Sequence, residues 1–340
     1  MYSQAIKPPL LSRSFWIEEP GRGAIRSSEA PEMDKAAAAG AVVVQARFGA
    51  LSRGTEACVF QGRVPASEWA RMRCPFQEGD FPGPVKYGYI SVGRVLAGPG
   101  HLSGRDVFCL YPHQTLYTVP ASAVTPLPDD VPAERAVLAA NMETAVNVLW
   151  DAGLLAGDRV TVVGGGVLGC LIAYLAARIP GTDVAIVDPD DGKANVYQSI
   201  GVRFYHPDTA ECGRDIVIHT SATEAGLRLC LTLARDEGRI IEASWYGDRE
   251  VSLPLGQDFH SRRLQLIGSQ VGMVSSAKRA THSYADRMAL ALSLLGDPAL
   301  DALFTHEIAF DDLPDRFPDF AANGSGVACV RIRYPDSPAS

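Results

Sequence analysis

The stretch Val160-Thr-Val-Val-Gly-Gly-Gly-Val-Leu-Gly169 decides the fold class of this chain. A short β-branched run enters a glycine-rich turn, and an apolar run of helical length leaves it. Gly164, Gly166 and Gly169 fit the pattern G-x-G-x-x-G. In this pattern the first glycine permits a tight turn, the second lets backbone approach a pyrophosphate, and the third lets helix and strand pack closely. The stretch predicts a dinucleotide site at a helix N-terminus. The alternative is a glycine-rich turn in an ordinary α/β domain.

A second apolar run ends at Asp188, about 20 residues beyond the glycines, where a carboxylate can accept hydrogen bonds from a ribose. A carboxylate there favours a 2′-hydroxyl and repels a 2′-phosphate, and the neighbouring residues add acid but no Arg. The sequence therefore predicts NAD(H) in preference to NADP(H). The residues beside these two features are further candidates for cofactor contacts: Val167, Leu168, Pro189 and Lys193.

Strands and helices alternate beyond the glycine turn. Predicted strands are Val160–Val163, Val184–Val187, Ile216–His219, Arg239–Ala243 and Leu264–Ile267, and the helices between them are Leu168–Ile179, Lys193–Ile200 and Glu224–Ala234. Such alternation predicts a parallel sheet with right-handed crossovers. Residues 1 to about 125 read instead as short strands bounded by Gly, Pro and Ser. Further helices are predicted at Ala133–Ala152 and Met273–Leu295, and a last strand at Val327–Arg333.

The fold class is therefore α/β with two domains. A doubly wound parallel-sheet domain is expected at residues 131–273, and a β-rich domain at residues 1–130 and 274–340. A chain of 340 residues is long for one core, which also favours two domains. Strand carboxyl ends face the ligand crevice in open α/β sheets. His219 and Ser221 follow this rule as candidate cofactor contacts, although a buried core histidine is the alternative.

Bulk composition excludes several classes of partner. The formal net charge of -8 argues against nucleic acid, which requires a basic face. No apolar segment of a secretion signal follows Met1. The uncharged run 160–177 approaches membrane-spanning length, but three consecutive glycines interrupt it. The seven cysteines show no C-x-x-C spacing, which favours reduced thiols in a cytoplasmic protein without a zinc ribbon.

Three segments resemble the medium-chain dehydrogenase/reductase superfamily: Leu51-Ser-Arg-Gly-Thr-Glu56, Gly88-Tyr-Ile-Ser-Val-Gly93, and the Gly164 turn with Asp188. The first two look most like its bacteriochlorophyllide a dehydrogenase-like branch. The resemblance implies a GroES-like β-rich catalytic domain, a Rossmann domain, and an oxidoreductase activity on a small molecule. It also implies cofactor contacts from Ser244 and Trp245 after one strand and from Ser269 and Gln270 after the next. Family members commonly form homodimers through sheet edges, which here points to residues 266–274.

The zinc ligands of metal-using relatives are not matched here. The resemblance places Arg53 where those relatives have Cys, and Tyr89 and Ile90 where they have His and Glu. These side chains cannot rebuild a tetrahedral zinc site, so no metal is expected. Without zinc, hydrogen-bond donors must stabilise charge on the substrate oxygen, or the substrate must be a conjugated enone.

Arg53, Tyr89 and Thr144 are the candidate catalytic residues. Arg53 and Tyr89 occupy the former ligand positions, and Thr144 resembles the family residue beside the nicotinamide ring. The alternatives are a salt bridge for Arg53, a packing role for Tyr89, and a helix-interior hydroxyl bonded to its own backbone for Thr144. Glu143 is a possible acid or base, or a solvated helix residue.

The sequence thus predicts a zinc-independent NAD(P)-dependent oxidoreductase. The hydride would pass between nicotinamide and a carbonyl, secondary alcohol or enone. An NADPH-dependent quinone or enone reductase is one alternative. A non-catalytic dinucleotide-binding redox sensor or structural subunit is another, because no proton-relay triad is recognisable.

Overall fold

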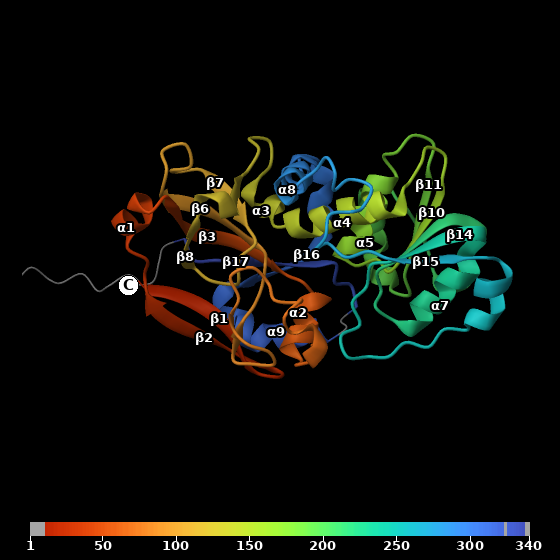
Figure 1. The fold of residues 1–340 in the computed structure, drawn as a ribbon, viewed down its shortest axis with the longest axis horizontal. Helices are drawn as coiled ribbons and strands as arrows, with labels where there is room; N and C mark the ends of the chain where they lie inside the picture. Colours follow the sequence, from red (N-terminus) through yellow and green to blue (C-terminus); the bar gives the residue numbers. More distant parts are fainter. Residues whose placement is uncertain (1–10, 323–324, 337–340) are drawn as a thin grey trace, which may run out of the picture. The chain divides into compact units, whose positions relative to one another are not determined.

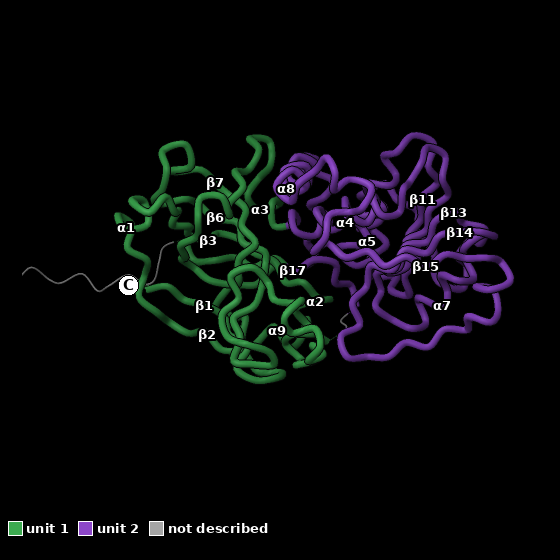
Figure 2. Tube along the Cα trace, viewed as in Figure 1, with its two compact units in different colours: residues 1–137, 307–322, 331–340 green, residues 138–306, 323–330 purple. Residues whose placement is uncertain are grey.

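The computed structural model describes residues 11–322 and 325–336, and its chain forms two compact units (Figures 1 and 2). The start of the chain, where a secretion signal was judged absent, lies outside the described residues. Unit 1 comprises residues 1–137, 307–322 and 331–340, and unit 2 comprises residues 138–306 and 323–330. Among the described residues, no helix has the length and apolar character needed to cross a bilayer.

Unit 2 is built on a six-stranded parallel sheet with the strand order β12-β11-β10-β13-β14-β15. Figure 1 labels β10, β11, β14 and β15 of this sheet. The strand order reverses at β10, so the crossover helices before and after this point cover opposite faces. The strands are β10 (Arg159–Val163), β11 (Asp183–Val187), β12 (Arg203–Tyr205), β13 (Arg214–His219), β14 (Ala234–Glu242) and β15 (Gln265–Gly268). The helices are α4 (Ala139–Ala152), α5 (Val167–Ala176), α6 (Ala194–Ser199), α7 (Glu224–Leu233) and α8 (Tyr284–Ser293).

Continuous apolar runs place these strands in the core. Val160, Val162, Ile216 and Ile218 are fully buried, as expected for central strands covered on both faces. The register aligns the carboxyl ends of β11, β10, β13, β14 and β15, because Val163 pairs with both Val187 and His219, and Glu242 pairs with both His219 and Gly268. The residues that follow these ends therefore form one rim, on which the predicted cofactor contacts lie.

Unit 1 is β-rich. Its sheets have the orders β2-β1-β5-β4 and β16-β17-β3-β6-β7-β9, with β8 paired to β3. The strands are β1 (Leu11–Glu19), β2 (Arg22–Glu29), β3 (Ala41–Leu51), β4 (Glu78–Gly79), β5 (Val85–Lys86), β6 (Ser91–Ala97), β7 (Asp106–Cys109), β8 (Leu116–Pro120) and β9 (Val124–Pro126). Its helices are α1 (Met33–Ala38), α2 (Thr55–Phe60), α3 (Ala133–Ala136) and α9 (Leu313–Ala321), whereas β16 (Phe304–Ala309) and β17 (Cys329–Arg333) begin in unit 2 and end in unit 1.

The second domain boundary differs from the sequence-based expectation, which assigned residues 274–340 to the β-rich domain. Residues up to His306 group with the parallel sheet instead. The reason is α8, whose buried Arg287 donates to Glu143 of α4 at 3.0 Å. Arg287 also donates to the backbone carbonyls of Val271 and Met273. These bonds attach the segment after β15 and α8 to the Rossmann-type unit.

Two helix predictions also differ from the structure. The expected helix Ala133–Ala152 is divided into α3 and α4, and the expected helix Met273–Leu295 is reduced to α8. Helix α8 starts late because Ser283 and Asp286 form a capping box, which fixes the first turn at Tyr284. The residues before Ser283 form turns.

Candidate functional site

The glycine turn of unit 2 has the geometry that the pattern predicts. Gly164 adopts φ +113°, and Gly169 packs so closely that a Cβ would lie 1.9 Å from the carbonyl oxygen of Gly164. At Gly166, by contrast, a Cβ would meet nothing within 4 Å. Gly166 is the N-cap of α5 and has no side-chain cap. The turn thus leaves open space beside helix N–H groups, which suits an anion such as a pyrophosphate. Val167 and Leu168, half-buried, begin this helix.

Asp188 lies directly after β11 and is only 7% exposed. Its Oδ2 accepts from the backbone N–H of Gly165 at 2.6 Å and from Lys193 Nζ at 3.1 Å. Its Oδ1 accepts from the N–H of Asp190 at 2.8 Å. The carboxylate is therefore fixed against the glycine turn. Lys193 is buried in this ion pair, and Pro189 beside it is exposed.

A second polar cluster lies where β13 and β14 end. His219 is fully buried, with Nδ1 2.9 Å from Glu242 Oε2 and Nε2 2.7 Å from Ser221 Oγ. Glu242 also accepts from the backbone N–H of Ser244 at 2.7 Å and from the Tyr246 hydroxyl at 3.0 Å. His219 therefore satisfies the core-histidine alternative, and its bonds join the two loops that follow β13 and β14.

The remaining predicted residues of unit 2 occupy several settings. Trp245 is half-buried, and Gln270 is exposed. Ser269 donates to Asp151 at 2.6 Å, which ties the end of β15 to α4. The Thr144 hydroxyl donates to the carbonyl of Ala140 at 2.9 Å, so the backbone-bonded alternative is the arrangement observed. Their contacts with a cofactor stay predictions.

Glu143 is neither solvated nor available as an acid or base. It is 6% exposed and paired with Arg287. Burial is the largest effect on its pKa and raises it, while the Arg287 charge opposes this rise. The sequence could not show this pairing, because the partner stands more than 140 residues away on α8.

In unit 1, Tyr89 follows β5 and is half-buried, and its hydroxyl makes hydrogen bonds with Ser52 and Thr55. Burial and the nearby charge of Glu56 raise the pKa of Tyr89 well above its ordinary value, although the two hydrogen bonds oppose the rise. The phenol therefore stays protonated near neutral pH and can donate a hydrogen bond. Arg53 Nε donates to the carbonyl of Phe320 at 3.3 Å.

Sequence reasoning missed a buried pair beside Tyr89. His113 Nε2 lies 2.9 Å from Glu56 Oε2, and these residues are 1% and 2% exposed. Glu56 belongs to the quoted Ser-Arg-Gly-Thr-Glu motif, but the sequence assigned it no function. His113 lies in a turn between β7 and β8, and its distance in sequence from other candidate residues matches no known motif. Gly88 supports the pair, because a Cβ there would lie 3.1 Å from the His113 ring.

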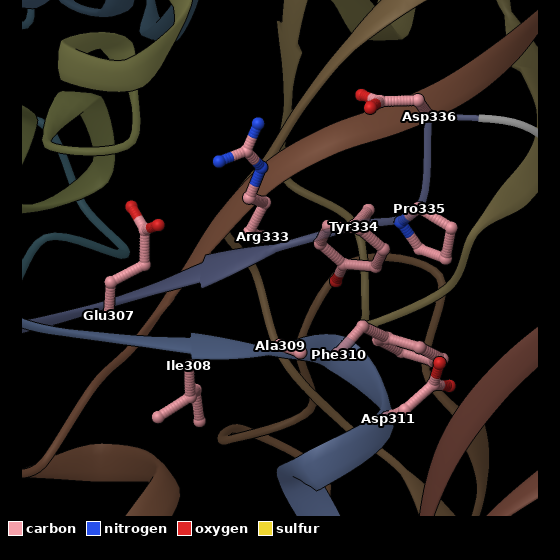
Figure 3. Close-up of a pocket in the computed structure, with 9 residues that line it drawn as sticks. All are labelled: Glu307, Ile308, Ala309, Phe310, Asp311, Arg333, Tyr334, Pro335 and Asp336. Atoms are coloured by element: carbon pink, nitrogen blue, oxygen red, sulfur yellow. The ribbon is translucent and has the colours of Figure 1, made fainter.

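A cavity of about 450 Å³ lies elsewhere in unit 1, at the ends of β16 and β17 (Figure 3). Its lining includes Glu307, Arg333 and Tyr334, and it contains none of the predicted site residues. Within residues 11–322 and 325–336, no group of three or more His, Cys, Asp or Glu side chains is placed to hold a metal ion.

No protein-family model matches the sequence. The chain is 26% identical over 268 residues to D-guloside 3-dehydrogenase of Escherichia coli K12, which covers 70% of this chain and 76% of the relative. It is 25% identical over 169 residues to 2-dehydro-3-deoxy-L-galactonate 5-dehydrogenase of Pseudoalteromonas atlantica, covering 46% of this chain and 49% of that relative. The chain thus matches about half of the latter protein's length.

The crystal structure of L-idonate 5-dehydrogenase from Escherichia coli superposes with a TM-score of 0.77 at 16% sequence identity, covering 95% of this chain and 98% of the other. All three of these proteins are dehydrogenases. The α/β fold expected from the resemblance, with a β-rich unit and a Rossmann-type unit, is therefore confirmed.

Proposed function

We propose that the protein is a zinc-independent, NAD-dependent oxidoreductase that transfers a hydride between nicotinamide and a secondary alcohol or its carbonyl product. The observation that supports this most directly is the glycine turn with open space at Gly166 and a carboxylate fixed at Asp188. Likeness to D-guloside 3-dehydrogenase favours a hydroxylated, sugar-like substrate. With its reduced thiols, the protein would act in the cytoplasm.

The bound dinucleotide would supply the hydride acceptor or donor. The backbone N–H groups around Gly166 would bind the pyrophosphate, and Asp188 would receive the ribose hydroxyls. The Tyr89 hydroxyl would donate a hydrogen bond to the substrate oxygen and oppose charge build-up there. Arg53 and Thr144 are proposed to orient the substrate and the nicotinamide.

A test of this function follows NADH absorbance while the protein is mixed with secondary alcohols, sugar acids, ketones, enones and quinones. Turnover of a hydroxyl compound or its ketone supports the proposal. Turnover of enones or quinones alone would instead identify the protein as a quinone or enone reductase. Tight NADH binding without turnover of any class would replace it with the sensor.

Cofactor preference provides the first prediction. NADH should bind more tightly than NADPH, because Asp188 repels a 2′-phosphate and already holds the nearest cation, Lys193. Asp188→Ala should reduce the ratio of NADH affinity to NADPH affinity by on the order of tenfold. The change removes the repulsion of the 2′-phosphate and releases Lys193 to bind it. Fluorescence titration with both cofactors measures this. Tighter NADPH binding by the unaltered protein would contradict the assignment.

Metal content provides the second prediction. The purified protein should hold far less than one zinc per chain, because Arg53, Tyr89 and Ile90 supply neither thiolate, imidazole nor carboxylate. Elemental analysis measures this directly. A chelator should leave NADH binding and turnover unchanged. One tightly held zinc whose removal abolishes turnover would show that other residues form a metal site.

Assembly provides the third prediction, a homodimer formed through β15. This strand is one edge of the six-stranded sheet, and Leu266 within it and Met273 after it are 39% and 62% exposed. An unpaired edge with exposed apolar side chains favours pairing with a second copy. Light scattering at micromolar concentration should give a dimer mass, and Leu266→Lys should shift it toward the monomer. A monomeric unaltered protein would refute the prediction.

A further inference from the structure

We propose that Ser221, His219 and Glu242 form a second catalytic site, in which an activated serine hydrolyses small esters that carry a good leaving group. His219 and Glu242 end two neighbouring strands, β13 and β14, and Ser221 lies in the turn that joins β13 to α7; Figure 2 labels all three elements. The three residues belong to unit 2. Ester hydrolysis needs no dinucleotide, so this activity goes beyond the hydride transfer proposed above.

The three side chains are connected in the order serine, histidine, carboxylate. Ser221 Oγ lies 2.7 Å from His219 Nε2, and His219 Nδ1 lies 2.9 Å from Glu242 Oε2. His219 is fully buried, whereas Ser221 is half-buried. A nucleophile, a base and a group that orients the base occur in this order and at these distances in serine hydrolases of unrelated folds. The imidazole is thus shielded, while the residue that carries the hydroxyl is partly exposed.

The other hydrogen bonds of Glu242 set the direction of those to His219. Oε1 of Glu242 accepts from the backbone N–H of Ser244, and Oε2 accepts from the Tyr246 hydroxyl. Burial, and then the nearby charge of Glu242, raise the pKa of Tyr246 well above its ordinary value, so that its hydroxyl remains a donor. The arrangement that satisfies these atoms has Nδ1 of His219 donating to Glu242 and Nε2 accepting from Ser221. An accepting Nε2 is what a general base requires.

A second hydroxyl extends this row of hydrogen bonds. Thr223 Oγ1 accepts from the backbone N–H of Gly226 at 3.0 Å and lies 2.9 Å from Ser221 Oγ. Because the Ser221 hydrogen points to His219, Thr223 donates to the Ser221 oxygen. Each hydroxyl in the row therefore donates once. The Ser221 oxygen retains a second lone pair for attack on a carbonyl carbon.

The backbone holds Ser221 in a tight turn between a strand and a helix. Ala222 adopts φ +51°, in the left-handed region that residues with a Cβ rarely occupy. Holding it there costs on the order of 1 kcal/mol. Thr223 is the N-cap of the ten-residue helix α7, so first-turn N–H groups follow the serine closely. A strained strand-to-helix turn presents the nucleophile in one large class of esterases, and N–H donors stabilise the charge that develops on the carbonyl oxygen.

Gly226 leaves room for the contact between the serine and the histidine. A Cβ at this position would lie 2.3 Å from Ser221 Oγ and 2.8 Å from His219 Nε2. Any larger residue would therefore displace the serine from the base. Because Ser221 is itself half-buried, a small acyl group such as acetyl fits this setting better than a long chain.

The reaction balances with water as the only added reagent. The Ser221 oxygen bonds to the acyl carbon, and its proton moves to His219 Nε2. The bond from the acyl carbon to the leaving oxygen then breaks, and the alcohol takes the proton from Nε2. Water attacks the acyl-serine and gives one proton to Nε2, which returns it to the Ser221 oxygen as the acyl bond breaks. The products are a carboxylic acid and an alcohol, and nothing is oxidised or reduced.

Labelling of the purified full chain with a fluorophosphonate tests the site, because this probe reacts with serines that a base activates. Mass spectrometry of peptides should find the probe on Ser221, and Ser221→Ala should carry none in that peptide. His219→Gln should slow the labelling by about a hundredfold or more, since it removes the base. Gly226→Ala should slow it as well, although all three side chains are kept.

Hydrolysis of p-nitrophenyl acetate measures turnover. The unaltered protein should exceed Ser221→Ala by about a hundredfold in kcat/KM, because the hydroxyl and the base act together. The matched control is Ser199→Ala, which removes an exposed serine of unit 2 whose hydroxyl donates to the backbone carbonyl of Asn195. This variant should leave labelling and hydrolysis unchanged.

A folded, unaltered protein that carries no probe on Ser221 overturns the proposal. Ester turnover that is the same in Ser221→Ala, even with Ser221 labelled, also rejects hydrolysis at this site. Labelling at an unchanged rate in His219→Gln shows that the histidine is structural and rejects the triad. If His219→Gln does not fold, Glu242→Gln replaces it and should also slow the labelling. Neither assay contains a dinucleotide, so its result leaves the proposed oxidoreductase function untouched.

Discussion

Gly169→Ala should unfold the dinucleotide turn and abolish NADH binding. The new Cβ would lie 1.9 Å from the carbonyl oxygen of Gly164 and 2.8 Å from the Thr220 hydroxyl oxygen, so the backbone itself must move. Forcing a methyl group into such a contact should reduce the free energy of unfolding by about 3 kcal/mol. Chemical denaturation measures this loss, and fluorescence titration measures the loss of NADH binding.

Gly166→Ala is the matched control for that change. Its Cβ would meet nothing within 4 Å, and its backbone φ of −74° is ordinary for alanine. Stability should therefore change by less than about 1 kcal/mol. NADH affinity should nevertheless fall, because the methyl group enters the space proposed for the pyrophosphate. A Gly166→Ala protein that binds NADH normally would show that the pyrophosphate lies elsewhere.

The parallel sheet was predictable because its determinants are local. The short β-branched run before Gly164 favours a buried strand. Glycines at fixed spacing then specify the turn that follows it. The predicted central strands match β10, β11 and β13 to within one or two residues at each end. Helix α7 is confirmed as well, since Thr223 caps it and its apolar residues recur with helical spacing.

Features that depend on distant partners were not predictable. Helix periodicity at 273–295 overestimated α8, because the capping box of Ser283 and Asp286 starts the helix at Tyr284. Arg287 in addition bonds the carbonyls of Val271 and Met273 in the turns that precede it. Glu143 was expected in solvent or as an acid or base, and the same arginine buries it. No local pattern distinguishes a surface Arg–Glu pair from one that attaches α8 to α4.

The candidate site likewise contains features that a local motif predicts and features that depend on distant contacts. Positions in the glycine turn and Asp188 follow from a motif with a physical mechanism. The structure fixes Asp188 against the turn through Gly165, and the contacts of these residues with a cofactor stay predictions. The motif around Arg53 and Tyr89 identified the segments, but it did not reveal the Glu56–His113 pair, which unites α2 with the turn before β8. Single histidines in turns have many uses, so only the three-dimensional contact with Glu56 singles out His113.

Tyr89→Phe should reduce kcat by on the order of a hundredfold or more, because it removes the hydrogen-bond donor proposed for the substrate oxygen. The ring is retained, and with it the edge-on packing against Tyr87 at 6.3 Å between ring centroids. NADH affinity should be unchanged, since the glycine turn belongs to unit 2. Steady-state kinetics with a substrate identified by NADH absorbance, together with NADH titration, measures both quantities.

Tyr87→Phe is the control that distinguishes a donor from an aromatic wall. Tyr87 is buried beside Tyr89, and its hydroxyl donates to the backbone carbonyl of Met72 at 3.2 Å. Losing that bond should cost about 1 kcal/mol of stability and leave kcat within about twofold. If Tyr89→Phe turned over as fast as Tyr87→Phe, the Tyr89 ring would serve only as packing.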